Sequence, residues 1–305
     1  MPEITGIGIA VYDILLLLKS FPQEDTKYQA SEMLSQPGGP VSSALFTAAK
    51  LGSSAAYLGL MAEDYYGKMI LNDFKKNNIQ TESIRTIAGG TTTCSYVLIN
   101  QERMTRTCIW TKGNIPSPSP DDIDLKNLCS SKILLLDGHH FEASYFAAKK
   151  IHESGGIVLL DSGKMHDGME KLLPLADIMI PSESFALNFT GKDNAEDAAK
   201  ELFCLFHPRI IVVTQGAEGG LIYDGKNIIR YPAFHVSVID TNGAGDVFHG
   251  AFAAGILNGW NFYQCAVFSS AVSALKCRRL GTHSGVPDFE SIMQFLKSNH
   301  EEDLF

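Results

Sequence analysis

The sequence predicts an α/β fold: a doubly wound, mostly parallel sheet flanked by helices, with a small β-sheet lid. Short apolar runs typical of buried parallel strands alternate with amphipathic helical patterns along most of the chain. Two other stretches, at about residues 14–36 and 90–112, contain short strand patterns without a helix. A glycine-rich turn leads into a helix that is apolar or small at nearly every position. Alternating strands and helices favour a parallel sheet covered on both faces.

The composition is that of an ordinary globular protein. The chain has 305 residues, of which 45% are hydrophobic and 19% charged, so residues 1–305 can form a single domain with the lid strands inserted in it. The formal net charge of −9 argues against nucleic acid or an anionic membrane as a partner. No export signal or membrane span is visible, so we expect a cytoplasmic protein. The 6 cysteines include no Cys-x-x-Cys pair, which disfavours zinc and disulfides.

The first strand is predicted at residues 4–10 and ends near Asp13. Gly6 and Gly8 could begin a dinucleotide-binding fingerprint. Val11 stands where the third glycine would be, and no helical pattern follows, so we disfavour that interpretation.

The lid strands come next, interrupted by one helix. Residues 14–36 and 90–112 are predicted to form a small sheet apart from the main body. Its apolar face would need a partner to cover it, so a homodimer through this sheet is expected. Between the two stretches, Gly38 and Gly39 precede a helix at residues 41–51.

The remaining strands and helices alternate regularly. Because ligands in doubly wound folds bind beyond the carboxyl ends of the strands, the polar residues there should ring one cleft. These are Asp13, Asp137 to His139, Asp161, Ser182, Glu183, residues 214–216 and the turn at 240–246. The strands are predicted at 55–60, 132–137, 157–161, 177–181 and 209–214, and the helices at 64–77, 145–154 and 195–205.

The turn at residues 240–246 has the features of an anion site. It ends in Gly243, Ala244, Gly245 and Asp246, which are the first turn of a helix that continues through the apolar residues 247–257. The first N–H groups of a helix have no partner within it, and the helix dipole adds positive potential there. A carboxylate at such a place is useful if it handles a proton, so we predict Asp246 as a general base beside an anion hole.

The same turn carries a family resemblance. Asp240-Thr241-Asn242-Gly243-Ala244-Gly245-Asp246, followed by Phe248 and Gly250-Ala251, resembles the signature of the ribokinase-like (PfkB) carbohydrate kinases. The likeness runs over essentially the whole chain and is strongest to the ketohexokinase and sulfofructose kinase branch. It implies ATP-dependent phosphorylation of a sugar hydroxyl, with a ketose and a primary hydroxyl as the expectation. Asp246 would be the base, and the N–H groups of residues 243–245 the anion hole.

The resemblance also implies binding residues. The sugar contacts would be Asp13, Lys27, Gly38, Gly39, Ser43 (where the family usually has Asn), Trp110 and His139. The nucleotide contacts would be Thr214, Gly216, Gly219, Cys277, Gly281 and His283.

Two cation sites follow from the resemblance. Magnesium would bridge the ATP phosphates, held through water with help from Glu183. A monovalent cation, K⁺, would be held by Asp240 and the carbonyl of Asn242, with further ligands from the later loop. That loop has Gly285 where a serine is common in the family.

Alternatives remain open at this level. A nucleoside kinase of the same fold would need an aromatic slot, for which Trp110, Tyr96 and Phe141 are the candidates. A nucleotide- or sugar-binding regulator with weak turnover is a third reading, because Ser182 and Phe185 replace the ends of the family's Asn-x-x-Glu motif. Trp110 could cover a sugar or fill a dimer contact. His249 and the pair His139-His140 are expected to be a packed histidine and a pair without metal, respectively.

Overall fold

The central element is a nine-stranded sheet in the order β15-β14-β13-β12-β11-β10-β1-β4-β6. The computed structural model describes residues 1–305, apart from the side chain of residue 302. All strand pairs from β6 to β13 are parallel, and only β14 and β15 run antiparallel to their neighbours. The strands are β1 (Ile4–Ile7), β4 (Ala55–Tyr57), β6 (Ile79–Gln80), β10 (Ile133–Leu136), β11 (Ile157–Ser162), β12 (Ile178–Pro181), β13 (Ile210–Thr214), β14 (Gly220–Tyr223) and β15 (Ile228–Tyr231).

The parallel strands are apolar throughout because both faces of the sheet are buried. In β10, Ile133 and Leu135 belong to one hydrophobic cluster, while Leu134 and Leu136 belong to another on the opposite face. Successive side chains of a strand point to opposite faces, so a strand covered on both sides reads as a continuous apolar run.

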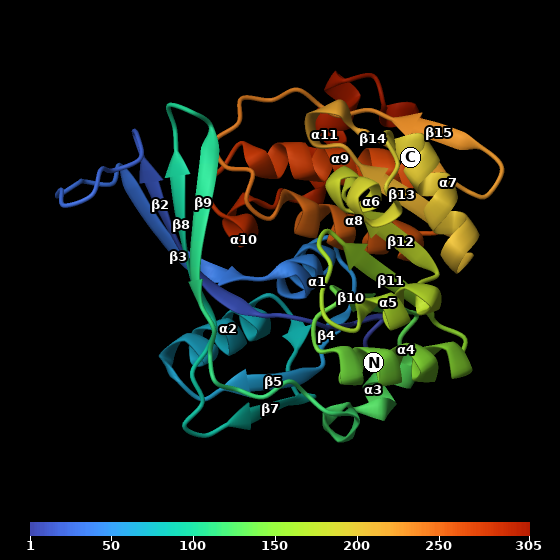
Figure 1. Cartoon of the computed structure of the whole chain (residues 1–305), viewed down its shortest axis with the longest axis horizontal. Helices are drawn as coiled ribbons and strands as arrows, with labels where there is room; N and C mark the ends of the chain where they lie inside the picture. The colour runs from blue at the N-terminus through green and yellow to red at the C-terminus, as the bar shows by residue number, and fades with distance from the viewer.

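Helices cover both faces, as the doubly wound prediction requires (Figure 1). One face packs against α1 (Pro40–Lys50), α2 (Tyr65–Lys76), α8 (Ala244–Leu257), α9 (Phe262–Cys277) and α11 (Phe289–Ser298). The other packs against α3 (Leu125–Ser130), α4 (Phe141–Glu153), α5 (Met169–Leu172), α6 (Glu183–Thr190) and α7 (Ala195–Phe206). The short helices are α10 (Thr282–Gly285) and the 3₁₀ turns η1 (Pro120–Asp122), η2 (Leu173–Leu175), η3 (Gly216–Glu218) and η4 (Glu302–Leu304).

A separate four-stranded sheet stands at one side of the main body (Figure 1). Its order is β3-β2-β8-β9, with β2 and β8 parallel and the outer pairs antiparallel. The strands are β2 (Val11–Leu18), β3 (Glu32–Gly38), β8 (Cys94–Asn100) and β9 (Thr105–Thr111), and they lie in the two stretches where the sequence predicts strands without a helix.

One predicted strand is wrong as a single element. Residues 55–60 contain the whole of β4 and the start of β5 (Gly59–Ala62), and β5 pairs with β7 (Ile84–Ile87) in a sheet of its own. Gly59 has φ +142°, a conformation that side chains rarely adopt, and it turns the chain out of the main sheet.

Other boundaries differ less. Helix α4 begins at Phe141, one turn before the predicted residue 145, after His140 in the left-handed region with φ 55°. The predicted helices at 41–51, 64–77 and 195–205 agree with α1, α2 and α7 within one residue at each end. Among the residues that the structure describes, no helix is both long and apolar enough to cross a bilayer.

Candidate active site

Helix α8 starts as the sequence predicts. Gly243 is its N-cap with φ 73°, and a Cβ there would lie 2.3 Å from Thr282 Oγ1, so both the conformation and the space require glycine. Gly245 is exposed, and a Cβ on it would meet nothing within 4 Å. The N–H of Ala244 donates to Thr241 O at 3.3 Å, so it is less free than predicted for an anion hole. The N–H groups of Gly243 and Gly245 have no acceptor among the described residues, which leaves them to a ligand.

Asp246 lies in the first turn of α8 and is half-buried. Burial and the neighbouring negative charge of Asp161 raise the pKa of Asp246 to about 7, against an opposing effect of His249. The charges of Asp13 and Asp137 raise it further. A carboxyl group with a pKa near neutrality can accept a proton at physiological pH, as a general base must.

His249 follows Asp246 by one turn of α8 and touches the same acids. Its Nδ1 lies 2.6 Å from Gly245 O and 3.5 Å from Asp161 Oδ2, and its Nε2 lies 3.2 Å from Ile180 O. The two ring nitrogens thus face two main-chain carbonyls and the Asp161 carboxylate. The packed histidine expected from the sequence therefore also lies next to the acid cluster.

Asp13 is held tightly in β2. It is buried, and its Oδ1 accepts a hydrogen bond from Ser95 Oγ at 2.5 Å. A Cβ on Gly38 would lie 2.0 Å from Asp13 Oδ2, so this position of β3 leaves room for the carboxylate only as glycine. Burial raises the pKa of Asp13, against the hydrogen bond from Ser95. Gly39 caps α1 with φ 95°.

His139 and Asp137 form a second polar group at the end of β10. Asp137 accepts hydrogen bonds from Ile9 N at 2.8 Å and His139 N at 3.0 Å. His139 Nδ1 lies 3.2 Å from Asp137 Oδ1, and the ring of His166 packs on that of His139 with centroids 3.9 Å apart. Burial lowers the pKa of His139, but contact with Asp137 outweighs this and raises it above its usual value. The imidazole of His139 can therefore donate a hydrogen bond to a ligand oxygen beside it.

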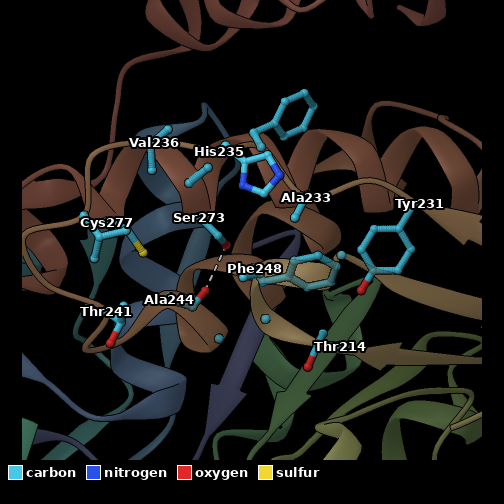
Figure 2. Close-up of a pocket in the computed structure, with 18 residues that line it drawn as sticks. Thr214, Tyr231, Ala233, His235, Val236, Thr241, Ala244, Phe248, Ser273 and Cys277 are labelled. Carbon is cyan, nitrogen blue, oxygen red and sulfur yellow. Dashed lines mark hydrogen bonds between the residues drawn. The ribbon is translucent and has the colours of Figure 1, made fainter. Parts of the chain in front are cut away.

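An apolar cavity of about 310 Å³ opens beside the start of α8 (Figure 2). Phe248 and Tyr231 line it, and its wall continues to Thr241 and Gly245 at the helix start. Of the predicted nucleotide contacts, this cavity is lined by Thr214, Gly216, Gly219 and Cys277. An apolar cavity ending at free helix N–H groups suits a planar base with phosphates attached.

Two predicted nucleotide contacts are not among the residues that line this cavity. His283 is buried against Phe46, with ring centroids 3.9 Å apart, and its Nδ1 lies 3.0 Å from Asp73 Oδ2. The N–H of Gly281 donates to Asp240 Oδ2 at 2.9 Å. Gly281 therefore supports the turn at Asp240, whereas His283 packs against α1 and α2.

The oxygens predicted to hold a monovalent cation are already hydrogen-bonded. Lys276 Nζ, on α9, lies 2.9 Å from Asp240 O and 3.3 Å from Asp240 Oδ2. Asn242 O accepts a hydrogen bond from Thr282 Oγ1 at 3.2 Å. Burial lowers the pKa of Lys276, and the charge of Asp240 opposes that shift. Sequence reasoning missed Lys276, since a lysine near the end of a helix is ordinarily a solvated cap.

Four other predicted residues lie in different surroundings. Glu183 is the first residue of α6 and accepts a hydrogen bond from Gln215 Nε2 at 2.7 Å, next to the end of β13. Ser43 is fully buried in α1, so a direct sugar contact there is not visible. Lys27 is exposed between β2 and β3. Trp110 is 60% exposed on β9 and is paired with Ser95 on the neighbouring strand β8.

Register places Trp110 on the site side of the small sheet. Trp110 is paired with Ser95, and Ser95 with Asp13, so the three side chains share one face. Arg106, on the same face of β9, donates from Nη1 to Thr241 Oγ1 at 2.7 Å. The small sheet therefore contacts the turn that begins α8.

Comparison with known proteins finds similarity to sugar kinases over nearly the whole chain. The chain is 22% identical to a ribokinase of Lactococcus lactis over 97% of this chain and 98% of that protein, and 24% identical to a mouse ketohexokinase over 90% and 96%. The structure of Arabidopsis thaliana ribokinase complexed with ribose and ATP superimposes with a TM-score of 0.83 at 25% identity, covering 97% of this chain and 99% of that one.

The fold is thus the predicted ribokinase-like α/β fold. The family model described as pfkB family carbohydrate kinase matches residues 1–288. The chain belongs to the PfkB family of carbohydrate kinases.

Proposed function

We propose that this protein transfers the γ-phosphoryl group of Mg-ATP to a hydroxyl of a sugar, with a ketose and its primary hydroxyl as the acceptor. One observation carries the proposal: the pKa of Asp246 is raised to about 7 at the open start of α8, between an apolar cavity and the acid-lined end of the sheet. A base, an anion hole and two neighbouring binding regions are what phosphoryl transfer to an alcohol needs.

Asp246 acts as the base in this proposal. Its carboxylate takes the proton of the sugar hydroxyl as the hydroxyl oxygen attacks the γ-phosphorus. The N–H groups of Gly243 and Gly245 face the charge that develops on the transferring group, and the helix dipole adds to their effect. His249 lies next to Asp161, and its electrostatic effect limits how far the pKa of Asp246 rises.

Magnesium supplies charge neutralisation on the β- and γ-phosphates when Mg-ATP is bound. Among the described residues no group of three or more His, Cys, Asp or Glu side chains could hold a metal by itself, so the phosphates and water would provide most ligands. Glu183 fits an outer role, because Gln215 holds its carboxylate at the end of β13 beside the cavity. Glu183 has this position although Ser182 and Phe185 differ from the family's Asn-x-x-Glu motif.

The sugar would lie between the main sheet and the small sheet. Asp13, fixed by Ser95 and the close approach of Gly38, accepts hydrogen bonds from sugar hydroxyls. His139 donates to a further oxygen, and Trp110 covers the sugar from β9. The contact between Arg106 and Thr241 supports a lid role for the small sheet, which excludes water from the reaction. Lys27 is exposed in the segment between β2 and β3.

The ketose assignment draws on the full-length similarity to a ketohexokinase. The nucleoside reading receives less support, because two of its three aromatic candidates lie apart. Tyr96 is on the opposite face of the small sheet from Trp110, and Phe141 packs on Tyr145 in α4. The regulator reading remains the second candidate, since the metal-organising motif is altered.

The test is ADP release from Mg-ATP across ketoses, aldoses and nucleosides, with titration calorimetry of ATP as a parallel measurement. Turnover on a ketose supports the proposal. Turnover on nucleosides alone would move the assignment to the other acceptor class. ATP or sugar binding without turnover on any acceptor would favour the regulator.

A further inference from the structure

An ammonium group occupies the place where the family resemblance implies a monovalent cation. Lys276 is fully buried, and its Nζ donates to Asp240 O at 2.9 Å and contacts Asp240 Oδ2 at 3.3 Å. Asp240 itself is only 2% exposed. A buried lysine is rare unless it is paired, so this contact is a built feature of the turn rather than a surface ion pair.

The other oxygens of the turn are also engaged. Asp240 Oδ1 accepts from Asn242 N at 2.8 Å, and Oδ2 accepts from Gly281 N at 2.9 Å. Asn242 O accepts from Thr282 Oγ1 at 3.2 Å. A K⁺ ion would need several of these oxygens at once and would lie against the ammonium group, whose like charge repels it. The residues present therefore do not fit a monovalent cation.

Packing around the lysine stem points the same way. A Cβ on Gly285 would lie 3.0 Å from Lys276 Cγ and 3.3 Å from Cε. Glycine at this position makes room for the stem, whereas the serine common in the family would crowd it. Gly285 thus leaves the space that the Lys276 side chain fills, and a site that binds a free cation would need neither residue.

Lys276 fixes the turn that precedes the anion hole. The carbonyl of Cys277, the next residue of α9, accepts hydrogen bonds from Ile239 N at 2.8 Å and Asp240 N at 3.2 Å. With the Lys276 contacts, the end of α9 holds both the backbone and the carboxylate of Asp240. Gly243, the N-cap of α8, follows three residues later.

We propose that the Lys276 ammonium replaces the monovalent cation of related kinases, so that phosphoryl transfer by this protein does not depend on K⁺. Lys276 is a positioning residue: it touches neither nucleotide nor sugar, and it acts by holding the Asp240 turn in the shape that presents the Gly243 and Gly245 N–H groups. The expected effect on kcat rests on the proposed kinase function. The expected effect of cations on the melting temperature does not, because it concerns only the stability of the folded protein.

The first test uses the wild-type protein. Thermal unfolding and ADP release are measured in KCl, NaCl and choline chloride at equal ionic strength. We expect the same melting temperature and the same kcat in all three salts. A melting temperature or kcat that K⁺ raises selectively would overturn the proposal. The melting series remains informative even if no acceptor is turned over, so a failure here is distinguishable from a failure of the kinase assignment.

The second test opens the cation position with Lys276→Ala. Removing one partner leaves the buried Asp240 carboxylate unpaired, so we expect a lower melting temperature and a kcat reduced by about 10-fold or more in choline chloride. K⁺ or NH₄⁺ should then raise both quantities, and KM for ATP and sugar should change less than kcat. Unchanged melting temperature and kcat in this variant would contradict the positioning role.

Lys50→Met is the matched control. Lys50 Nζ also donates to a carbonyl of the same loop, Val286 O, at 2.6 Å, but no carboxylate takes part in that contact. We expect this variant to show no selective response to K⁺. A K⁺ response equal to that of Lys276→Ala would attribute the effect to general loosening of the loop and overturn the assignment.

Discussion

At the residue scale, the account depends on the environment of Asp246. The charges of Asp161, Asp13 and Asp137 act on its carboxyl group. A negative charge nearby disfavours the ionised form and so raises the pKa of a carboxyl group. Burial and these charges act in the raising direction, and the His249 charge holds the pKa near neutrality instead of above it. A pKa near neutrality lets the Asp246 carboxylate accept a proton at physiological pH, which the proposed role as base requires.

This tuning predicts a pH dependence. Because the base must be deprotonated, kcat/KM of the wild type should rise through an apparent pKa of about 7 and reach a plateau above it. His249→Gln removes the side chain that lowers the pKa of Asp246, so the rising limb should move to higher pH. The pH profile of initial rates at low sugar concentration measures both. A wild-type profile that stays flat from about one unit below to about one unit above this apparent pKa would contradict the role of Asp246.

At the scale of elements, two helix ends and one sheet meet at the turn 240–243. Helix α8 presents its open start, α9 ends against the same turn, and β9 reaches it through Arg106. The long-range contacts among these elements bring together residues that are far apart in sequence. The site is thus assembled by packing of α8 on α9 and by the position of the small sheet.

The β9 contact predicts a specific loss. Arg106→Ala removes the hydrogen bond to Thr241 Oγ1, so closure of the lid should be less favourable and kcat/KM for the sugar should fall by about 3- to 10-fold, the range of one exposed hydrogen bond. Stopped assays of ADP release with and without sugar measure the change. Lys112→Ala, a second exposed cation just after β9, is the control and should leave kcat/KM unaltered. Equal losses in both variants would show a general charge effect instead of a lid contact.

At the scale of the whole molecule, the outer face of the small sheet is unpartnered. The side chains of Ile14, Tyr96 and Ile109 are paired across β2, β8 and β9 on the face opposite to Trp110. Leu16, Met33 and Leu98 continue the same face. Met33 and Ile109 are 67% and 54% exposed, which is costly for a monomer in water. We propose that two copies cover this face in a homodimer.

The dimer proposal predicts the effect of one charge. Ile109→Asp places a carboxylate in the centre of the covered face, so the variant should be a monomer at concentrations where the wild type is a dimer. Light scattering during size-exclusion chromatography measures the mass. Leu205→Asp, on α7 and similarly exposed at 52%, is the control and should leave the mass unchanged. A monomeric wild type would rule the proposal out.

Sequence patterns predicted the elements best where burial dictates the residue type. The strands of the parallel sheet were predicted from continuous apolar runs, because both faces of that sheet are buried. The start of α8 was predicted from its glycine-rich turn, and Gly243 adopts the left-handed φ that favours glycine. The break after β4 was missed because apolar residues continue through it, and only the φ of Gly59 ends the strand. The Lys276 contact could not be predicted, since it joins residues 36 positions apart.

The functional residues divide in the same way. Asp246 was singled out by the local motif at residues 240–246 and Asp13 by the family resemblance, and their roles stay predictions. Asp13 lies within β2 of the small sheet rather than at the end of a main-sheet strand. His283 was assigned to the nucleotide by resemblance alone, and its stacking on Phe46 depends on how α10 packs against α1. Side-chain direction at such positions is a property of tertiary packing rather than of the local pattern.

The measurement that tests the central claim most directly is ADP release from Mg-ATP with the best ketose, comparing the wild type with Asp246→Asn. We expect the substitution to lower kcat by about 10²- to 10⁴-fold while the dissociation constant for ATP stays within a few fold, because the base is lost and the apolar cavity is not touched. A variant that keeps wild-type kcat would contradict the assignment of Asp246 as the base.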